Sequence, residues 1–385
     1  MKNILIPGGA GFIGSNLTVE LLSRGYYVTI LDNLSSQIHY ENEFNFSHKN
    51  FKFIQGDVRV ISDWKAAIKD QDAIIHYASE TGTGQSMYEI NRYTNVNVVG
   101  TSNLFHCLSN YKHKVRKIIL ASSRAVYGEG KYFSNEEGVM YPCSRNYKLV
   151  SKGKYDHYGK NGCLLELRPT DEKSMIQPSS VYAITKSTQE QIIMLMGKAL
   201  SIPTVALRYQ NVYGPKQSLR NPYTGILSVF STRILNGNNI HIYEDGLQSR
   251  DFVFISDVVA ATILSLENQE SNYHIFNVGS GNPTSVNDIA LKLTNELGIK
   301  NKIKITGQYR IGDIRHNYAC LNKIKKVLDF EPKYDVDLGI KKFVSWLKTQ
   351  KVQTKVTSLP KGWQAPDDDE SKLSTVNNVD IVSIQ

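Results

Sequence analysis

Long apolar stretches, cysteine pairs and dense basic clusters are all missing from this 385-residue sequence. No run of about 18 apolar residues occurs, so we expect no membrane insertion. The apolar start, Asn3 to Pro7, runs directly into glycines and lacks a signal-peptide cleavage pattern, which favours a cytoplasmic protein.

The four cysteines include no C-x-x-C pair, so we expect thiols in a reducing compartment rather than disulfides. Cys143, His157 and Cys163 do not have the spacing of metal ligands. We therefore predict no metal site.

Basic residues outnumber acidic residues but do not form clusters. Lys plus Arg (45) outnumber Asp plus Glu (36), and this net charge of +9 suits an anionic partner, either nucleic acid or a phosphorylated small molecule. The lysines are scattered over predicted surface helices instead of forming basic blocks with interleaved aromatics. We therefore expect a small phosphorylated ligand and no nucleic acid.

What the sequence does contain begins with a strand, a glycine turn and a helix. The apolar segment from Asn3 to Pro7 is followed by Gly8-Gly9-Ala10-Gly11-Phe12-Ile13-Gly14 and then by a helical pattern. Glycines at Gly8, Gly11 and Gly14 permit a tight turn and a close backbone approach to a pyrophosphate. The N–H groups that begin the helix suit the same phosphates.

Acidic residues at the ends of the next two strands extend this pattern. Asp32 ends the strand from Tyr27, about 20 residues beyond the glycines, where a carboxylate can accept hydrogen bonds from both ribose hydroxyls. The 2′-phosphate of NADP would be repelled by Asp32, and residues 33–36 contain no arginine to compensate its charge. We therefore expect NAD rather than NADP. Asp57, after the strand from Phe51, could accept from an adenine amine or cap the following helix.

The alternation of strands and helices continues, with strands at 73–78 and 115–120 around a helix-forming stretch at about 86–108. Asn97 within that stretch is expected to brace a neighbouring backbone, and His76 to be a core histidine. The pattern predicts an α/β fold with a doubly wound parallel sheet, the Rossmann arrangement.

Three side chains are candidates for chemistry. Tyr182 and Lys186 are four residues apart and share one face of a predicted helix, where a cation favours the phenolate of a neighbouring tyrosine. Ser123 lies just after the strand at 115–120, and ligands of such sheets bind outside the carboxyl ends of the strands. We therefore expect Ser123, Tyr182 and the glycine turn to converge on one crevice.

With these residues the sequence resembles the extended short-chain dehydrogenase/reductase family over about residues 1–347. The resemblance implies that Tyr182 is the base, that Ser123 shares the substrate oxygen, and that Lys186 holds the ribose of NAD. The cofactor contacts that it implies are Gly8, Gly11, Phe12, Ile13, Gly14, Asp32, Asn33, Asp57, Val58, Tyr77, Ala78, Lys186 and Tyr209.

Two later segments, Glu244–Phe252 and Gly312–His316, resemble those with which nucleotide-sugar enzymes of the family place arginines on a diphosphate. Arginine suits this role because its planar fork pairs with phosphate oxygens bidentately. The substrate contacts implied by the resemblance are Gln85, Ser123, Asn211, Arg250 and Arg315.

The two residues after Ser123 indicate the type of reaction. In 4,6-dehydratases of the family an Asp-Glu pair stands there, and decarboxylating relatives keep a carboxylate at the second position, whereas this sequence has Arg124 and Ala125. Reversible oxidation at one carbon remains, and a 4-epimerase of a nucleotide-diphosphate sugar needs this chemistry. The long connection at 128–178 and the surrounding motifs most resemble the dTDP-L-rhamnose 4-epimerases, although these often carry more cysteines there.

Three alternatives stay open. A UDP-glucose or UDP-N-acetylhexosamine 4-epimerase would use the same residues. A net NAD-dependent nucleotide-sugar reductase or dehydrogenase would consume or accumulate reduced cofactor. A catalytically idle NAD-binding regulator would be expected to have a damaged Ser–Tyr–Lys set, and here the set is intact.

The chain is expected to divide unevenly. An NAD-binding domain takes residues 1–210, with 251–279 returning to it, and a smaller α/β substrate-binding lobe takes 211–350. Residues 351–385 have the composition of a flexible tail. Helices at 86–108 and 181–196 are expected to form a homodimer face, as in the family.

Overall fold

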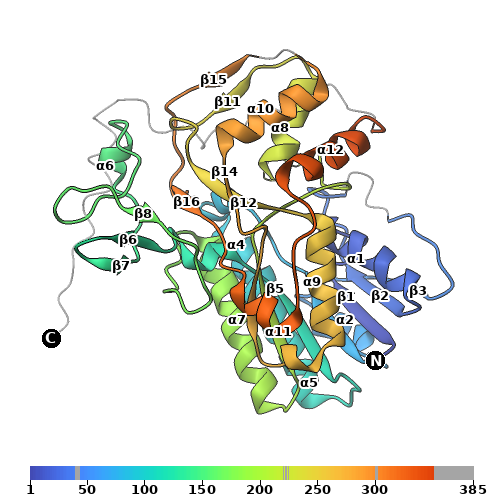
Figure 1. Ribbon diagram of the computed structural model, residues 1–385. Coiled ribbons are helices and arrows are strands. Elements are labelled where there is room, and N and C mark those ends of the chain that lie inside the picture. Colours follow the sequence, from blue (N-terminus) through green and yellow to red (C-terminus); the bar gives the residue numbers. More distant parts are fainter. Residues whose placement is uncertain (40–43, 220, 222, 224, 300–301, 351–385) are drawn as a thin grey trace.

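The computed structural model describes residues 1–39, 44–219, 221, 223, 225–299 and 302–350 (Figure 1). The predicted C-terminal tail, residues 351–385, lies outside the described residues. The described chain forms a large sheet covered by helices and a smaller lobe beyond the carboxyl ends of its strands (Figure 1).

The large sheet has seven parallel strands in the order β13-β9-β5-β4-β1-β2-β3. Its central strands are continuous apolar runs, as expected where both faces of a sheet are buried. The chain winds outward in both directions from β1, so a crevice opens between β1 and β4. The strands are β1 (Asn3–Pro7), β2 (Tyr27–Asp32), β3 (Phe51–Gln55), β4 (Ala73–His76), β5 (Lys117–Ser123), β9 (Thr204–Tyr209) and β13 (Ile275–Val278).

Helices cover both faces of this sheet. On one face α1 (Phe12–Ser23) and α9 (Ile255–Glu267) share an apolar core with the sheet and with the smaller lobe. A second core on the opposite face holds α2 (Ile61–Ala67), α5 (Gly100–Asn110) and α7 (Val181–Ala199). The predicted doubly wound α/β fold is confirmed.

The smaller lobe is built from short strands and three helices. Strands β10 (Asn211–Tyr213), β12 (Ser249–Phe254), β14 (Pro283–Ser285) and β16 (His316–Asn317) form one sheet, and β11 (Ile240–Ile242) pairs with β15 (Ile303–Ile305). The helices are α8 (Ile226–Leu235), α10 (Val286–Leu297) and α12 (Val336–Leu347).

The chain returns to the large sheet after β12. Residues 251–254 were expected with the large sheet but belong to β12, which pairs with β10, β14 and β16. The return itself is made by α9 and β13, and β13 pairs with β9. Helix α10 begins where the Ser285 Oγ accepts from the Asp288 N–H (3.0 Å), and Gly298 ends it at φ 68°.

The connection at 128–178 forms a separate three-stranded antiparallel sheet at the side of the molecule (Figure 1). Its elements are β6 (Tyr132–Ser134), β7 (Gly138–Met140), α6 (Tyr147–Val150) and β8 (Glu166–Leu167). Cys143 and Cys163 are both exposed, and no group of three potential ligands that could hold a metal occurs in the described part of the chain.

The predicted helix at 86–108 is not continuous. It is divided into α3 (Thr83–Ser86), α4 (Ile90–Tyr93), a π-helical segment at Thr94–Val99 and α5. The interruption lies at residues 87–89, and from Ile90 the chain stays helical through the π-helical segment into α5. Asn97 in the π-helical segment is fully buried: its Oδ1 accepts from the Glu80 N–H (2.8 Å) and its Nδ2 donates to the Thr185 Oγ1 (2.9 Å). Asn97 thus braces a backbone, as predicted, and also ties the segment to α7.

His76 is a core histidine, as predicted. It is buried at the end of β4, its Nε2 is 3.1 Å from the Thr101 Oγ1, and burial lowers its pKa to about 3.

Several apolar side chains are exposed on the predicted dimer face. Ile90, Val99, Ile184 and Leu195 leave apolar side chains exposed on the helices for which a dimer face is predicted; the homodimer stays a prediction. In the ranges that the structure describes, no helix is both long and apolar enough to cross a membrane.

Asn97→Ala should lower the free energy of unfolding by about 1–3 kcal/mol, because the buried Glu80 N–H loses its acceptor. Asn95→Ala, which changes the same residue type on the exposed side of the π-helical segment, should stay within about 0.5 kcal/mol. Urea denaturation measures both. Equal effects of the two substitutions would contradict the bracing role.

Candidate functional site

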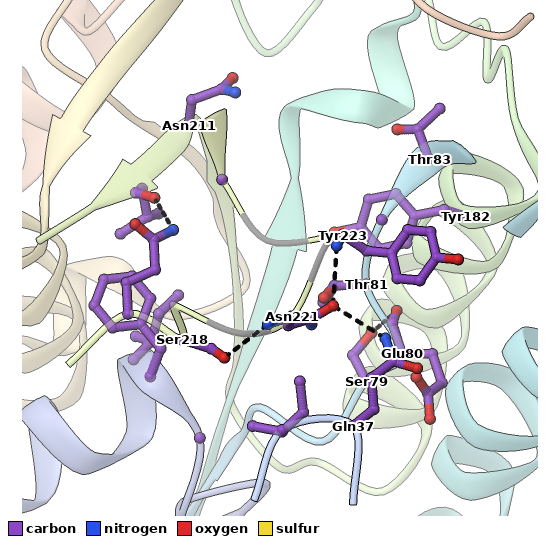
Figure 2. Close-up of a pocket in the computed structure, with 18 of the residues that line it drawn as sticks. Gln37, Ser79, Glu80, Thr81, Thr83, Tyr182, Asn211, Ser218, Asn221 and Tyr223 are labelled. Carbon is purple, nitrogen blue, oxygen red and sulfur yellow. Dashed lines mark hydrogen bonds between the residues drawn. The ribbon is translucent and has the colours of Figure 1, made fainter. Parts of the chain in front are cut away.

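A cavity of about 1840 Å³ lies at the carboxyl ends of the large sheet, where the smaller lobe faces it. Figure 2 shows part of this cavity, with Tyr182 and Asn211 on opposite sides. The structure brings most of the predicted site residues to its wall: Gly8, Gly11, Phe12, Ile13, Gly14, Asp32, Asn33, Asp57, Val58, Tyr77, Ala78, Ser123, Tyr182, Lys186, Tyr209, Asn211 and Arg250.

The glycine turn fits a dinucleotide pyrophosphate. Gly8 has φ 75°, and a Cβ there would lie 2.5 Å from the Ala78 N. Gly11 is the N-cap of α1 and supplies no side-chain acceptor, so the first N–H groups of the helix are available to phosphate oxygens. A side chain at Gly14 would collide with the turn itself, because its Cβ would lie 2.5 Å from the Gly9 Cα.

Asp32 lies at the end of β2 beside this turn. Its Oδ2 accepts from the Ala10 N–H (3.1 Å) and its Oδ1 from the Leu34 N–H (2.9 Å), which fixes the carboxylate at the cavity wall. Burial raises its pKa, and the backbone N–H of Leu34 and the neighbouring His39 oppose that rise. A carboxylate held in this way can accept from ribose hydroxyls.

Asp57 does not cap α2, whose N-cap is Val60. The Asp57 carboxylate instead accepts from the Arg59 side chain (2.7 Å) and from the Asn33 Nδ2 (3.0 Å). Although burial opposes it, these hydrogen bonds lower the pKa of Asp57 to about 2. The carboxylate therefore stays charged at the cavity wall, where an adenine amine could donate to it.

Tyr182 stands in the first turn of α7, which begins where the Ser180 Oγ accepts from the Ala183 N–H (3.2 Å). Burial raises the pKa of the Tyr182 phenol. This rise is opposed by a hydrogen bond with Ser123 and by the charge of Arg124. From the sequence we had expected this effect to come from Lys186.

Lys186 is buried one turn further along α7. Its Nζ donates to the Gln189 Oε1 (2.7 Å) and lies 3.5 Å from the Ser79 Oγ. Burial lowers its pKa to about 7. The ammonium is thus held at the cofactor side of the cavity, where it can donate to ribose hydroxyls.

The floor of the cavity contains a hydroxyl cluster that the sequence did not reveal. The Tyr209 OH lies 2.7 Å from the Thr262 Oγ1 and 3.1 Å from the Tyr77 OH. Both tyrosines were predicted to contact the cofactor, but Thr262 comes from α9, far along the chain. Only the return of α9 to the large sheet brings it here.

The placement predicted for Arg315 is wrong. Its guanidinium is buried away from the cavity and pairs with Asp156 (2.7 Å), Asp245 (2.7 Å) and Glu244 (3.3 Å). Three carboxylates accept from four of its five N–H groups, and the side chain is buried outside the cavity wall.

Gln85 also lies outside the cavity wall. It is buried in α3, where its Nε2 donates to the Glu89 Oε1 (2.9 Å) and to the Gln37 Oε1 (3.0 Å). Gln37 reaches across to the lobe and donates to the Asn221 Oδ1 (3.3 Å; Figure 2). Gln85 therefore supports the wall instead of forming it.

Arg250 and Asn211 do line the cavity. The Arg250 Nη2 donates to Asp313 (2.7 Å) and its Nη1 to the Arg315 carbonyl (2.9 Å), which fixes the guanidinium at the wall. The Oδ1 of Asn211 is buried and has no hydrogen-bond partner in the described part of the protein, so it is an acceptor awaiting a donor. Cations that were not predicted also line the cavity: Arg124, Lys216, Arg233 and Arg310.

Comparison with known proteins agrees with this geometry. The model of the NAD dependent epimerase/dehydratase family matches residues 4–279. A dTDP-L-rhamnose 4-epimerase of Burkholderia thailandensis is 36% identical over 349 residues, which are 90% of this chain and 95% of the relative. A putative UDP-glucose 4-epimerase of Methanocaldococcus jannaschii is 31% identical over 90% of this chain and 98% of its own. The crystal structure of a Thermotoga maritima UDP-glucose 4-epimerase with UDP-glucose has a TM-score of 0.74 at 28% identity, covering 90% of this chain and 98% of that one.

The chain belongs to the NAD dependent epimerase/dehydratase family. It is an enzyme with NAD as its cofactor, and its predicted resemblance to the epimerase branch of the extended short-chain dehydrogenases is confirmed. The relative from Burkholderia is of the kind to which the motifs around Ser123 pointed.

NAD should bind at least about tenfold more tightly than NADP, because a 2′-phosphate would face the Asp32 carboxylate. Asp32→Ser should reduce the ratio of NAD affinity to NADP affinity. Asp70→Ser, at an exposed ion pair with Lys114, should leave this ratio unchanged. Calorimetric titration measures both affinities. Tighter binding of NADP by the native protein would contradict the assignment.

Arg315→Met should destabilise the protein by about 1–3 kcal/mol, because the part-buried Asp156 and Asp245 lose their cation while the buried Glu244 keeps Arg145. Arg250→Met should mainly weaken binding of nucleoside diphosphates, because Arg250 faces the cavity. Thermal unfolding and titration with UDP and dTDP separate the two effects. A direct diphosphate contact of Arg315 would instead appear as weaker binding by a stably folded Arg315→Met variant.

Proposed function

We propose that the protein interconverts the C4 epimers of a nucleotide-diphosphate sugar, with dTDP-L-rhamnose or a similar deoxysugar as substrate. The observation that carries this proposal is the shortage of acids beside Tyr182. Asp32 and Asp57 lie at the adenosine end, where the glycine turn and β3 meet. The remaining carboxylates of the described wall are engaged, Glu80 with Arg92 (2.9 Å) and Asp313 with Arg250 (2.7 Å).

This shortage separates the reaction types of the family. Elimination of a hydroxyl needs a second acid and base next to the oxidised carbon, and here Arg124 and Ala125 occupy the positions directly after Ser123. Without such a pair, oxidation at one carbon can only be followed by reduction of the same carbon. Return of hydride to the other face then inverts that carbon.

The residues of the chain have separate tasks in this reaction. The Tyr182 phenolate accepts the proton of the sugar 4-hydroxyl and later returns it, and Ser123 donates a hydrogen bond to the same oxygen. Lys186 holds the cofactor ribose. NAD, when bound, supplies the acceptor and donor of the hydride. Tyr77 and Tyr209 line the cavity and would contact the nicotinamide.

Inversion also requires that the sugar turns over while its nucleotide stays in place. The four Nη N–H groups of Arg250 bond to Asp313 and to three backbone carbonyls, so its Nε and its charge at the cavity wall would hold the diphosphate, and the buried Asn211 Oδ1 can accept from a substrate hydroxyl. The cavity volume of about 1840 Å³ leaves room for two nucleotides and for rotation of the sugar.

The relatives favour this substrate class. The similar dTDP-L-rhamnose 4-epimerase is 36% identical to this chain, against 31% for the putative UDP-glucose 4-epimerase. A UDP-hexose 4-epimerase is the second candidate, because it would use the same catalytic set. A net dehydrogenase or reductase would differ in stoichiometry, since it consumes one NAD or reduced NAD per turnover.

The substrate is tested by incubating the protein with dTDP-, UDP-, CDP- and GDP-sugars and following the configuration at C4 by NMR. We expect dTDP-L-rhamnose or a similar deoxysugar to reach an equilibrium of C4 epimers without net change in reduced NAD. Conversion of none of the sugars, or conversion at another carbon, would refute the proposal; conversion of UDP-hexoses alone would select the second candidate.

Tyr182→Phe should reduce turnover by at least about 100-fold, because it removes the base, while NAD affinity changes little. Tyr158→Phe removes an exposed phenol on the connection at 128–178 and should retain full activity. Epimerisation assays and NAD titration measure the two properties. Substantial epimerisation by Tyr182→Phe would show that another group removes the proton.

A further inference from the structure

Arg124 occupies an unusual position beside the site. It is the first residue of a 3-10 turn (Arg124–Tyr127) that begins directly after Ser123, and its side chain lines the cavity together with Ser123 and Tyr182. The turn is fixed because the Ser123 Oγ accepts from the Ala125 N–H (3.1 Å). The backbone therefore presents Arg124 at the same end of β5 as the catalytic hydroxyl.

The guanidinium of Arg124 has no partner among the described residues, in contrast to the other arginines of the interior. Arg145, Arg208, Arg250 and Arg315 are buried, and each pairs with a carboxylate. No hydrogen bond or ion pair joins the Arg124 side chain to another described residue. The neighbouring charges of Arg250 and of its partner Asp313 act on Arg124 in opposite directions, so the guanidinium is available to an anion in the cavity.

The Tyr182 phenolate is the anion that we consider for Arg124, so the other charged and titratable groups around Tyr182 matter. Tyr93 on α4 packs edge-on against the Tyr182 ring, with centroids 6.4 Å apart, and carries no positive charge. The neighbouring α3 and the π-helical segment contain no titratable side chain. On α7 itself, the Lys186 Nζ donates to Gln189 and lies beside Ser79.

The remaining cation is Arg124. Its charge opposes the rise that burial causes in the pKa of Tyr182, and its own pKa of about 10 keeps it protonated at neutral pH. Lys186, one turn further along α7, is held by Gln189, and burial lowers its pKa to about 7.

We propose that Arg124 is a positioning residue that holds Tyr182 as the phenolate. The 4,6-dehydratases of the family have an acid at the position of Arg124, whereas here a cation stabilises the base. The inference rests on the proposed function of Tyr182 as the base. The Ser123 hydroxyl and the Arg124 guanidinium act on the same phenolate oxygen from adjacent positions of one turn, and the sugar 4-hydroxyl completes the group.

The test is the pH dependence of Tyr182 in the NAD-bound protein, compared between the native protein and Arg124→Met. The phenolate is the active form, so loss of the cation raises the pKa of Tyr182 and moves the acidic limb of kcat to higher pH. We expect a shift of about one pH unit, with kcat about tenfold lower at neutral pH and recovering in alkaline buffer. KM for the nucleotide sugar should change less than about threefold.

Three further measurements separate this role from a structural one. Arg124→Lys should restore most of the activity at neutral pH, because it retains the charge. Arg116→Met, at the opposite end of β5 and exposed, should leave the pH profile unchanged. NMR of tyrosines labelled at the ring carbon that bears the hydroxyl, with Tyr182→Phe for assignment, should show the shifted titration without any substrate.

The outcomes distinguish the inference from the function on which it rests. If Tyr182 is required but titrates identically in Arg124→Met, the proposed role of Arg124 is wrong. An unchanged pH profile with a much higher KM would instead show that Arg124 binds an anionic group of the substrate. If Tyr182→Phe still epimerises, the proposed function itself fails, whatever Arg124 does.

Discussion

The parallel direction of the large sheet is the constraint on which the rest of the structure depends. Because all seven strands end at one edge, the glycine turn after β1, Asp32 at the end of β2 and Ser123 at the end of β5 face one crevice. Close packing makes this geometry strict: Gly8 approaches Ala78 so closely that no side chain fits between them. The smaller lobe only has to cover an opening that the sheet has already made.

The sequence was sufficient for features that depend on local spacing. The glycine turn, Asp32 and the Tyr182–Lys186 pair are each specified within one turn or one strand, so they reach the cavity wall once the sheet is formed. The π-helical segment before α5 was harder to foresee, because the partners of its buried Asn97 lie in distant segments of the chain. Thr262 was missed for the same reason.

The failures at Gln85 and Arg315 have a different origin. A matching motif fixes the position of a residue along the chain but not the direction of its side chain. Arg315 turns away from the cavity because Asp156, from the connection at 128–178, and Asp245 offer it carboxylates. Arg124, by contrast, was noted in the sequence only as the absence of an acid; its lack of a partner among the described residues is visible only in three dimensions.

The buried ion pairs of Arg145 and Arg315 also limit how this enzyme can be altered in evolution or in the laboratory. Arg145 on the connection at 128–178 pairs with Glu244 of the lobe (2.8 Å), and Arg315 of the lobe pairs with Asp156 of the connection (2.7 Å). Each segment therefore holds charges that the other neutralises. Replacement of the connection alone would leave Glu244 without Arg145 and Arg315 without Asp156, so we expect changes in one segment to require changes in the other.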